Sequence, residues 1–91
     1  QNYPNPFNPV TVIRYQIPDA DAEDPANGGR LHVQLRVYNV LGQQVAELVN
    51  EAQSPGYRSV GFDAGRLPSG VYFTKLTAGK FTGVKKMLFL K

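Results

Sequence analysis

Four carboxylates share one short acidic stretch, and they are the first side chains here that could do chemistry. Asp19, Asp21, Glu23 and Asp24 belong to the segment DADAEDPANGG, at residues 19–29. Calcium prefers such oxygen ligands and takes about six to eight of them. An EF-hand loop also needs a central Gly and a final Glu, and neither stands at the required position. We therefore favour a solvated hairpin loop, while calcium binding stays open.

The single histidine is the next candidate. His32 lies on the polar side of an alternating segment, and its sequence neighbours offer no Ser, Asp and Lys arrangement for catalysis. Gly28-Gly29 matches neither GxxxxGK[ST] nor GxGxxG, the two phosphate-binding patterns. The chain has no cysteine, which excludes disulfides, thiolate metal sites and cysteine nucleophiles. We expect no enzyme activity, no cofactor and no assigned metal ligand.

The net charge of +3 is unevenly distributed. Residues 1–24 hold one arginine and four carboxylates, whereas residues 25–91 hold nine basic and three acidic side chains. Basic residues interleaved with aromatics can bind nucleic acid, and Phe73, Lys75, Phe81 and Lys85 weakly resemble that pattern. Apart from Lys85-Lys86, however, the basic residues are scattered. A solvated edge hairpin is favoured, and no nucleic-acid partner is expected.

Length and hydrophobicity indicate one small domain. A chain of 91 residues can bury only one small core. No apolar run approaches the roughly 18 residues of a membrane span, and no signal peptide is visible. Because the first residue is Gln, we expect the chain to be a piece of a longer protein.

Alternating apolar residues predict strands along most of the chain. Three prolines in residues 2–9 exclude a helix, and we expect a strap leading into the first strand, with Tyr3 and Phe7 packed on the sheet. Residues 10–17 form the first predicted strand and residues 30–38 the clearest one. Their inward positions are predicted to be Ile13, Tyr15 and Ile17, then Leu31, Val33, Leu35 and Val37.

The middle of the chain is more ambiguous. A turn at residues 39–42 precedes a strand at 43–50, although Val45 and Leu48 are also spaced as in a helix. Eight residues are short for a helix, so a strand followed by a turn at 51–56 is favoured. Residues 57–63 direct Val60 and Phe62 to one face. Gly61 between them suggests a bulge or a close backbone approach.

The last quarter is predicted to be a hairpin. A strand at residues 71–78, with Tyr72, Thr74 and Leu76 on one face, turns back into a strand at 81–90. The total is six or seven short strands with frequent turns. This pattern predicts an all-β fold, an immunoglobulin-like Greek-key β-sandwich of about seven short antiparallel strands. The missing Cys…Trp…Cys set excludes the antibody-like version.

Several segments resemble one known family. They are residues 2–9 (NYPNPFNP), 37–45 (VYNVLGQQV), 62–64 (FDA), 67–72 (LPSGVY) and 85–91 (KKMLFLK). In this order they resemble the C-terminal sorting domain of proteins exported by the type IX secretion system. That family is similar to the immunoglobulin-like domain of the flagellar hook-capping protein. The acidic segment 19–29 departs from it, since family members usually have a shorter hairpin there.

The resemblance implies a non-catalytic sorting signal covering residues 1–91. Such a domain directs a covalently linked N-terminal cargo through the periplasm to an outer-membrane translocon, for secretion or surface attachment, and is often cleaved there. We expect the signal in Gly70, Tyr72, Lys85, Lys86, Met87, Leu88, Leu90 and Lys91. Gly70 would permit the turn, the apolar members would shape the hairpin, and the lysines would supply charge. Each has a structural alternative, because the apolar ones can be core and the lysines can serve solubility.

A carbohydrate-binding or adhesion module of a secreted multidomain enzyme is the alternative function. Its candidate residues are Tyr38, Tyr57 and Phe73, which the alternation places away from the expected core. Exposed aromatic rings on a β-sandwich can form a flat platform for sugars. The sequence does not separate such a platform from ordinary packing between sheets.

Overall fold

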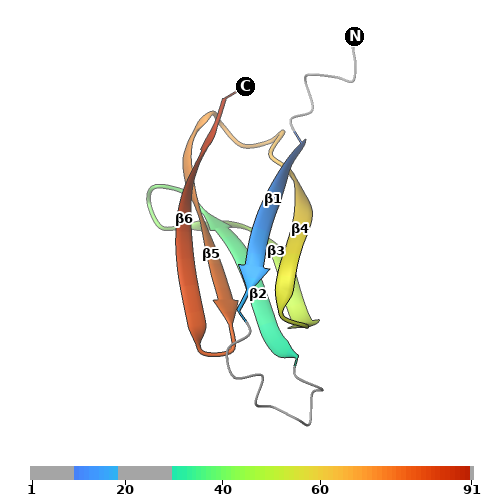
Figure 1. Cartoon of the computed structure of the whole chain (residues 1–91). Coiled ribbons are helices and arrows are strands. Elements are labelled where there is room, and N and C mark those ends of the chain that lie inside the picture. The colour runs from blue at the N-terminus through green and yellow to red at the C-terminus, as the bar shows by residue number, and fades with distance from the viewer. Residues whose placement is uncertain (1–9, 19–29, 91) are drawn as a thin grey trace.

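The computed structural model describes residues 10–18 and 30–90. These residues contain strands, turns and no helix, so no membrane-spanning helix occurs among them. Their strands are β1 (Val10–Ile17), β2 (Leu31–Tyr38), β3 (Gln44–Gln53), β4 (Gly56–Asp63), β5 (Gly70–Ala78) and β6 (Phe81–Phe89), all shown in Figure 1. The predicted strap (1–9), the acidic loop (19–29) and Lys91 lie outside the described residues.

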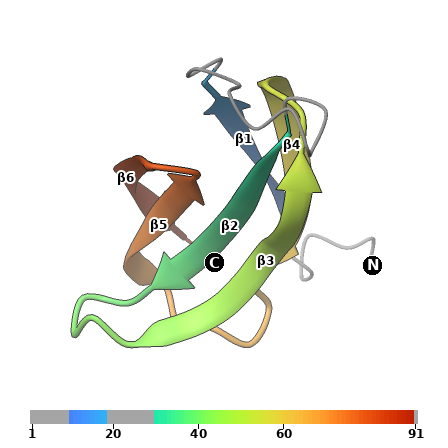
Figure 2. The same ribbon diagram turned by 90° about the horizontal axis from the view of Figure 1, so that it is seen from below.

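The strands form two antiparallel sheets. One sheet pairs β1 with β4, and the other has the order β3-β2-β5-β6. Figure 2 shows β1 and β4 stacked across the curved four-stranded sheet. In an immunoglobulin sandwich, β6, β5, β2 and β3 match strands G, F, C and C′, while β1 and β4 match B and E. The predicted fold class is confirmed, with six of the roughly seven expected strands in the described residues.

The core follows from alternation on β2. Val33, Leu35 and Val37 are almost completely buried, whereas His32 on the same strand is exposed. Ile17 of β1 packs against Val33 and Leu35 from the opposite sheet. Burying each such side chain contributes about 1.5–3 kcal/mol. The predicted inward positions of β1 and β2 are confirmed.

Strand β3 is longer and less regular than expected. Its pairing with β2 skips Leu48 and Val45, because Leu35 pairs with Val49 and Arg36 with Glu47, and a second shift follows Val37. Each bulge places two consecutive residues opposite one, which breaks the period of two. The helix-like spacing of the apolar residues on β3 is thus the spacing of a bulged strand. The turn predicted at 51–56 is wrong at its start, since β3 continues to Gln53 by pairing with Leu31.

Strand β4 is more regular than expected. Val60 and Phe62 face inward as predicted. Gly61, however, pairs in register with Val12 of β1, so the suggested bulge there is wrong. On β5, the predicted inward positions Tyr72, Thr74 and Leu76 are confirmed.

The turn between β2 and β3 is held by one side chain. Asn39 Oδ1 accepts hydrogen bonds from the backbone N–H of Leu41 (2.9 Å) and of Gln43 (3.0 Å). Gly42 takes a φ of +82°, a left-handed conformation that glycine adopts without strain. The turn predicted for this segment is confirmed, and it leaves Val40 and Leu41 exposed at its tip.

Candidate functional site

Strand β6 carries four of the eight predicted signal residues and forms one edge of the four-stranded sheet. It pairs only with β5 among the described strands, in a continuous register from Gly70 opposite Phe89 to Ala78 opposite Phe81. Every second N–H and C=O group of such a strand faces away from its neighbour. In the described part of the protein, these groups form a straight edge to which another strand can add.

The two neighbouring lysines of β6 point to opposite faces of the sheet. Lys85 pairs with Thr74, a buried residue of the inner face, whereas Lys86 pairs with Phe73 on the outer face. Successive side chains of a strand alternate between faces. The Lys85-Lys86 pair therefore does not form one charged patch, although the sequence interpretation grouped the two residues.

Three of the predicted signal residues hold the hairpin together. Gly70 begins β5 with a φ of +156°, which side-chain-bearing residues rarely adopt. Tyr72 is only 5% exposed, and its hydroxyl donates a 2.7 Å hydrogen bond to the Pro68 carbonyl oxygen. Met87 pairs with Tyr72 and packs, half-buried, against the same part of the core. These contacts fix where β5 and β6 run.

Two other predicted residues are exposed apolar side chains. Leu88 is 61% exposed and Leu90 is 76% exposed. Leu88 shares the outer face with Lys86, and the alternative that placed Leu88 in the core is wrong. Val84, two residues before Lys86 on the same face, is 62% exposed and was not singled out from the sequence. We call Val84, Lys86, Leu88 and Leu90 the terminal outer row.

A second overlooked residue positions this row. Phe89 is buried, and its ring lies 5.5 Å from that of Phe62 and 5.3 Å from that of Tyr72, measured between ring centroids. Tilted pairs at this distance add attraction beyond burial. Phe89 ties the end of β6 to both sheets and sets which neighbours face outward. Residues 84–90 read VKKMLFL and do not alternate between apolar and polar side chains, so no local pattern in the sequence marked Val84 or Phe89.

The opposite edge of the sheet, β3, carries a polar network. Arg36 Nε donates a 2.9 Å hydrogen bond to Glu47 Oε2, and this bond is the main reason why the pKa of Arg36 is raised above its ordinary value. His32 Nε2 lies 2.7 Å from Asn50 Oδ1, and Asn50 Nδ2 donates to Glu47 Oε1 at 3.4 Å. His32 thus takes part in a cross-strand contact on the sheet's outer face.

The alternative binding residues do not share one surface. Tyr38 and Phe73 are direct partners on the outer face of the four-stranded sheet, while Tyr57 is exposed on the two-stranded sheet. Phe73 and Lys75 likewise face away from Phe81 and Lys85. Neither the three-residue sugar platform nor the basic–aromatic nucleic-acid set forms as predicted.

Metal chemistry has few candidates in the described part of the protein. No three His, Asp or Glu side chains gather there in a way that could hold an ion. The acidic segment considered for calcium lies outside those residues, so that prediction stays untested.

Comparison with known families decides what this β-sandwich is. A family described as the secretion system C-terminal sorting domain matches residues 1–90. The chain belongs to this family. The comparisons with curated proteins and with solved structures give no match.

A type IX sorting domain is a secretion signal, and its family is not one of catalysts. It marks its protein for secretion or export to the cell surface. Membership also implies an interaction with the type IX secretion machinery and an attached cargo. The match covers all six described strands and the segment that precedes the first of them.

Proposed function

We propose that this sorting domain directs a cargo attached at its N-terminal side to the outer-membrane translocon, for export or for transfer to the surface-attachment machinery. The terminal outer row and the free edge of β6 form the surface that the translocon recognises. The observation that supports this proposal is that β6 presents exposed apolar side chains beside a straight edge that has no partner among the described strands.

Recognition by strand addition suits this arrangement. A strand added to β6 would gain main-chain hydrogen bonds along the edge, while the terminal outer row would supply specificity. Val84 and Leu88 offer apolar area, and Lys86 between them offers a charge on the same face. Gly70, Tyr72 and Met87 act through the position of the hairpin, so they serve the signal as architecture. Lys91 remains a proposed part of the signal by its sequence alone.

The proposal is tested by fusing residues 1–91 to a secreted reporter in a bacterium with type IX secretion. The fusion should reach the medium or the cell surface. Introducing Leu88→Asp should leave it in the periplasm, because the substitution places a charge in the apolar part of the row. Cell fractionation followed by immunoblotting measures the distribution.

The matched control is Thr82→Asp. Thr82 is also exposed on β6, on the same face as Leu88 but at the far end of the strand, and the substitution adds the same charge. We expect this variant to be exported. Equal export of the Leu88→Asp and Thr82→Asp fusions, with both domains folded by circular dichroism, would contradict the proposal.

A further inference from the structure

The outer face of the four-stranded sheet carries a shallow hollow of about 320 Å³. Its walls include Tyr38 of β2, Val40 of the β2–β3 turn, Phe73 and Lys75 of β5, and Val84 of β6. Four of these five side chains are apolar or aromatic, so the hollow offers apolar contact area with a charge at its border.

Strand pairing brings the wall residues together in two adjacent rows. In one row Tyr38 pairs with Phe73, and Phe73 pairs with Lys86. In the next row Lys75 pairs with Val84. Directly paired residues point to the same face of a sheet, with Cβ atoms about 5 Å apart. Each row therefore joins apolar surface to a lysine.

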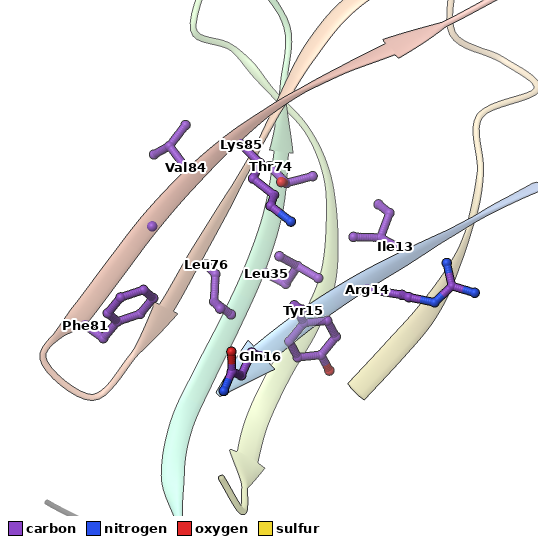
Figure 3. Close-up of a pocket in the computed structure, with 11 residues that line it drawn as sticks. Ile13, Arg14, Tyr15, Gln16, Leu35, Thr74, Leu76, Phe81, Val84 and Lys85 are labelled. Carbon is purple, nitrogen blue, oxygen red and sulfur yellow. The ribbon is translucent and has the colours of Figure 1, made fainter. Parts of the chain in front are cut away.

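The hollow is a preformed feature of the outer surface. Figure 3 shows Val84 on one side of β6, while Lys85 points to the other side, toward β1. The space between the two sheets is therefore separate from the hollow. Its rim is fixed, because the Asn39 side chain holds the turn that carries Val40. A site that exists before binding loses little conformational entropy when a ligand enters.

The charges of this face are unbalanced. Glu47 is the only carboxylate that the described strands place on it, and Arg36 binds Glu47 at 2.9 Å. Lys75 and Lys86 are exposed, and neither forms an ion pair with a described residue. The two lysines leave positive charge beside the apolar walls, which attracts a partner with carboxylates.

The shape of the site favours a protein segment over a membrane or a nucleic acid. The rings of Tyr38 and Phe73 are half-buried in the walls of a hollow, whereas an apolar surface that enters a bilayer must reach beyond its surroundings. Two lysines are few for a nucleic acid, whose backbone phosphates take many contacts. The volume lies at the lower end of the range for ligand pockets, about 300–1,000 Å³, and suits one bulky side chain.

We propose that this hollow binds an acidic segment of a partner protein. A bulky apolar side chain of the segment lies against Phe73 and Val84, and its carboxylates lie beside Lys75 and Lys86. This inference rests on the proposed function, because Val84 and Lys86 also belong to the terminal outer row, and it specifies the chemistry of the partner that contacts the row. Residues 1–9 do not supply such a segment, since they contain no carboxylate.

Three synthetic peptides test the proposal on the full 91-residue chain. The first is acetyl-Ser-Glu-Glu-Phe-Glu-Glu-Ser-amide, the second has Gln in place of every Glu, and the third has Ser in place of Phe. Titration of the first peptide into ¹⁵N-labelled protein, followed by NMR, should shift the amide signals of residues 38–42, 73–75 and 84–86 to saturation. The second and third should bind roughly tenfold more weakly, because one lacks the charges and the other lacks the apolar side chain.

Two adjacent lysines provide matched variants. Lys86→Glu should weaken binding of the first peptide roughly tenfold, whereas Lys85→Glu, which changes the net charge equally on the other face, should leave it unchanged. Both side chains are exposed, so both variants should fold, and the dispersion of the NMR signals verifies this. Equal weakening by the two variants, equal binding of the Glu and Gln peptides, or no saturable shifts at millimolar peptide overturns the proposal.

Other occupants of the hollow give different results. Signals of residues 19–24 that shift in Lys86→Glu, in a protein that does not bind the first peptide, would identify the chain's own acidic segment as the occupant. Sedimentation of the protein with phosphatidylglycerol vesicles, if Lys86→Glu abolishes it, would identify a membrane. Either result overturns the proposal.

Reporter export separates this inference from the proposed function. Lys75 is exposed and lies outside the terminal outer row, and Lys75→Glu should reduce export as Leu88→Asp does. Normal export of Lys75→Glu, with Leu88→Asp retained in the periplasm, would overturn the inference and leave the proposed function intact. Export of Leu88→Asp would contradict the proposed function, and the peptide titrations then decide the inference by themselves.

Discussion

The two edges of the four-stranded sheet are built in opposite ways. Strand β3 has two bulges and carries Glu47 and Glu51, and Glu47 is bound to Arg36. Strand β6 has a continuous register, lysines on both faces and exposed apolar side chains near its end. Bulges and paired charges hinder the addition of another strand, whereas a straight edge permits it. Among the described residues, the sheet is therefore closed at its β3 edge and available at its β6 edge.

The inner contacts of β6 explain how an exposed edge can still be well defined. Phe89 and Tyr72 lie in the core, and Met87 packs beside them. These residues hold the strand in one register, so the side chains between them face outward at fixed positions. Exposed and inward-packed side chains thus alternate along residues 86–89.

The largest expected effect on stability separates the buried residues of β6 from its exposed ones. Phe89→Ala should lower the free energy of unfolding by about 3 kcal/mol, because it removes a buried ring and two aromatic contacts. Leu88→Ala, its exposed neighbour, should change it by less than about 0.5 kcal/mol. Urea denaturation followed by circular dichroism measures both. Similar losses for the two variants would show that the end of β6 is not anchored through Phe89.

Removing the charges from either edge tests the same difference through self-association, with a smaller expected effect. The double variant Lys85→Val with Lys86→Val should self-associate more strongly than the unaltered protein, because a straight apolar edge accepts a second copy. Glu47→Val with Glu51→Val should remain monomeric, since the bulges of β3 persist. Sedimentation velocity at increasing protein concentration distinguishes the two. Self-association of only the β3 variant would reverse our assignment of the open edge.

A smaller effect is expected at Tyr72. Tyr72→Phe removes the hydrogen bond to the Pro68 carbonyl and should lower the free energy of unfolding by about 1 kcal/mol. Reporter export should be unchanged, since the ring and the path of β5 remain. Loss of export from a folded Tyr72→Phe variant would assign Tyr72 to the recognition surface itself.

The smallest effect is expected at the exposed ion pair of the closed edge. Glu47→Gln should leave the melting temperature within experimental error in 0.5 M salt, because partly exposed pairs contribute little and salt screens them. Differential scanning fluorimetry checks this. A clear decrease in high salt would show that β3 depends on this pair more than its exposure suggests.

Most of the fold could be predicted from alternation alone. On β2 the period of two gave the buried residues correctly, because that strand is central and paired on both sides. The end of β3 was missed because its pairing partner, Leu31, is distant in sequence and bulges hide the period. The local pattern of residues indicates which segments form strands, whereas pairing and register depend on contacts between distant segments.

The signal residues were harder to interpret than the strands. Tyr72 and Leu88 were expected to share one role, yet Tyr72 is buried, as the alternation of its strand predicted, and Leu88 is exposed. Lys85 and Lys86 were both expected to supply charge to the signal, although neighbouring residues of a strand point to opposite faces.

The most direct test of the central claim asks which edge contacts the secretion machinery. A photo-crosslinking phenylalanine analogue would replace either Leu88 on β6 or Asn50 on β3, both exposed, in the reporter fusion during export. We predict an ultraviolet-dependent crosslink to an outer-membrane protein of the translocon from position 88 and none from position 50. A crosslink from position 50 alone, or equal crosslinks from both positions, would contradict recognition through the edge of β6.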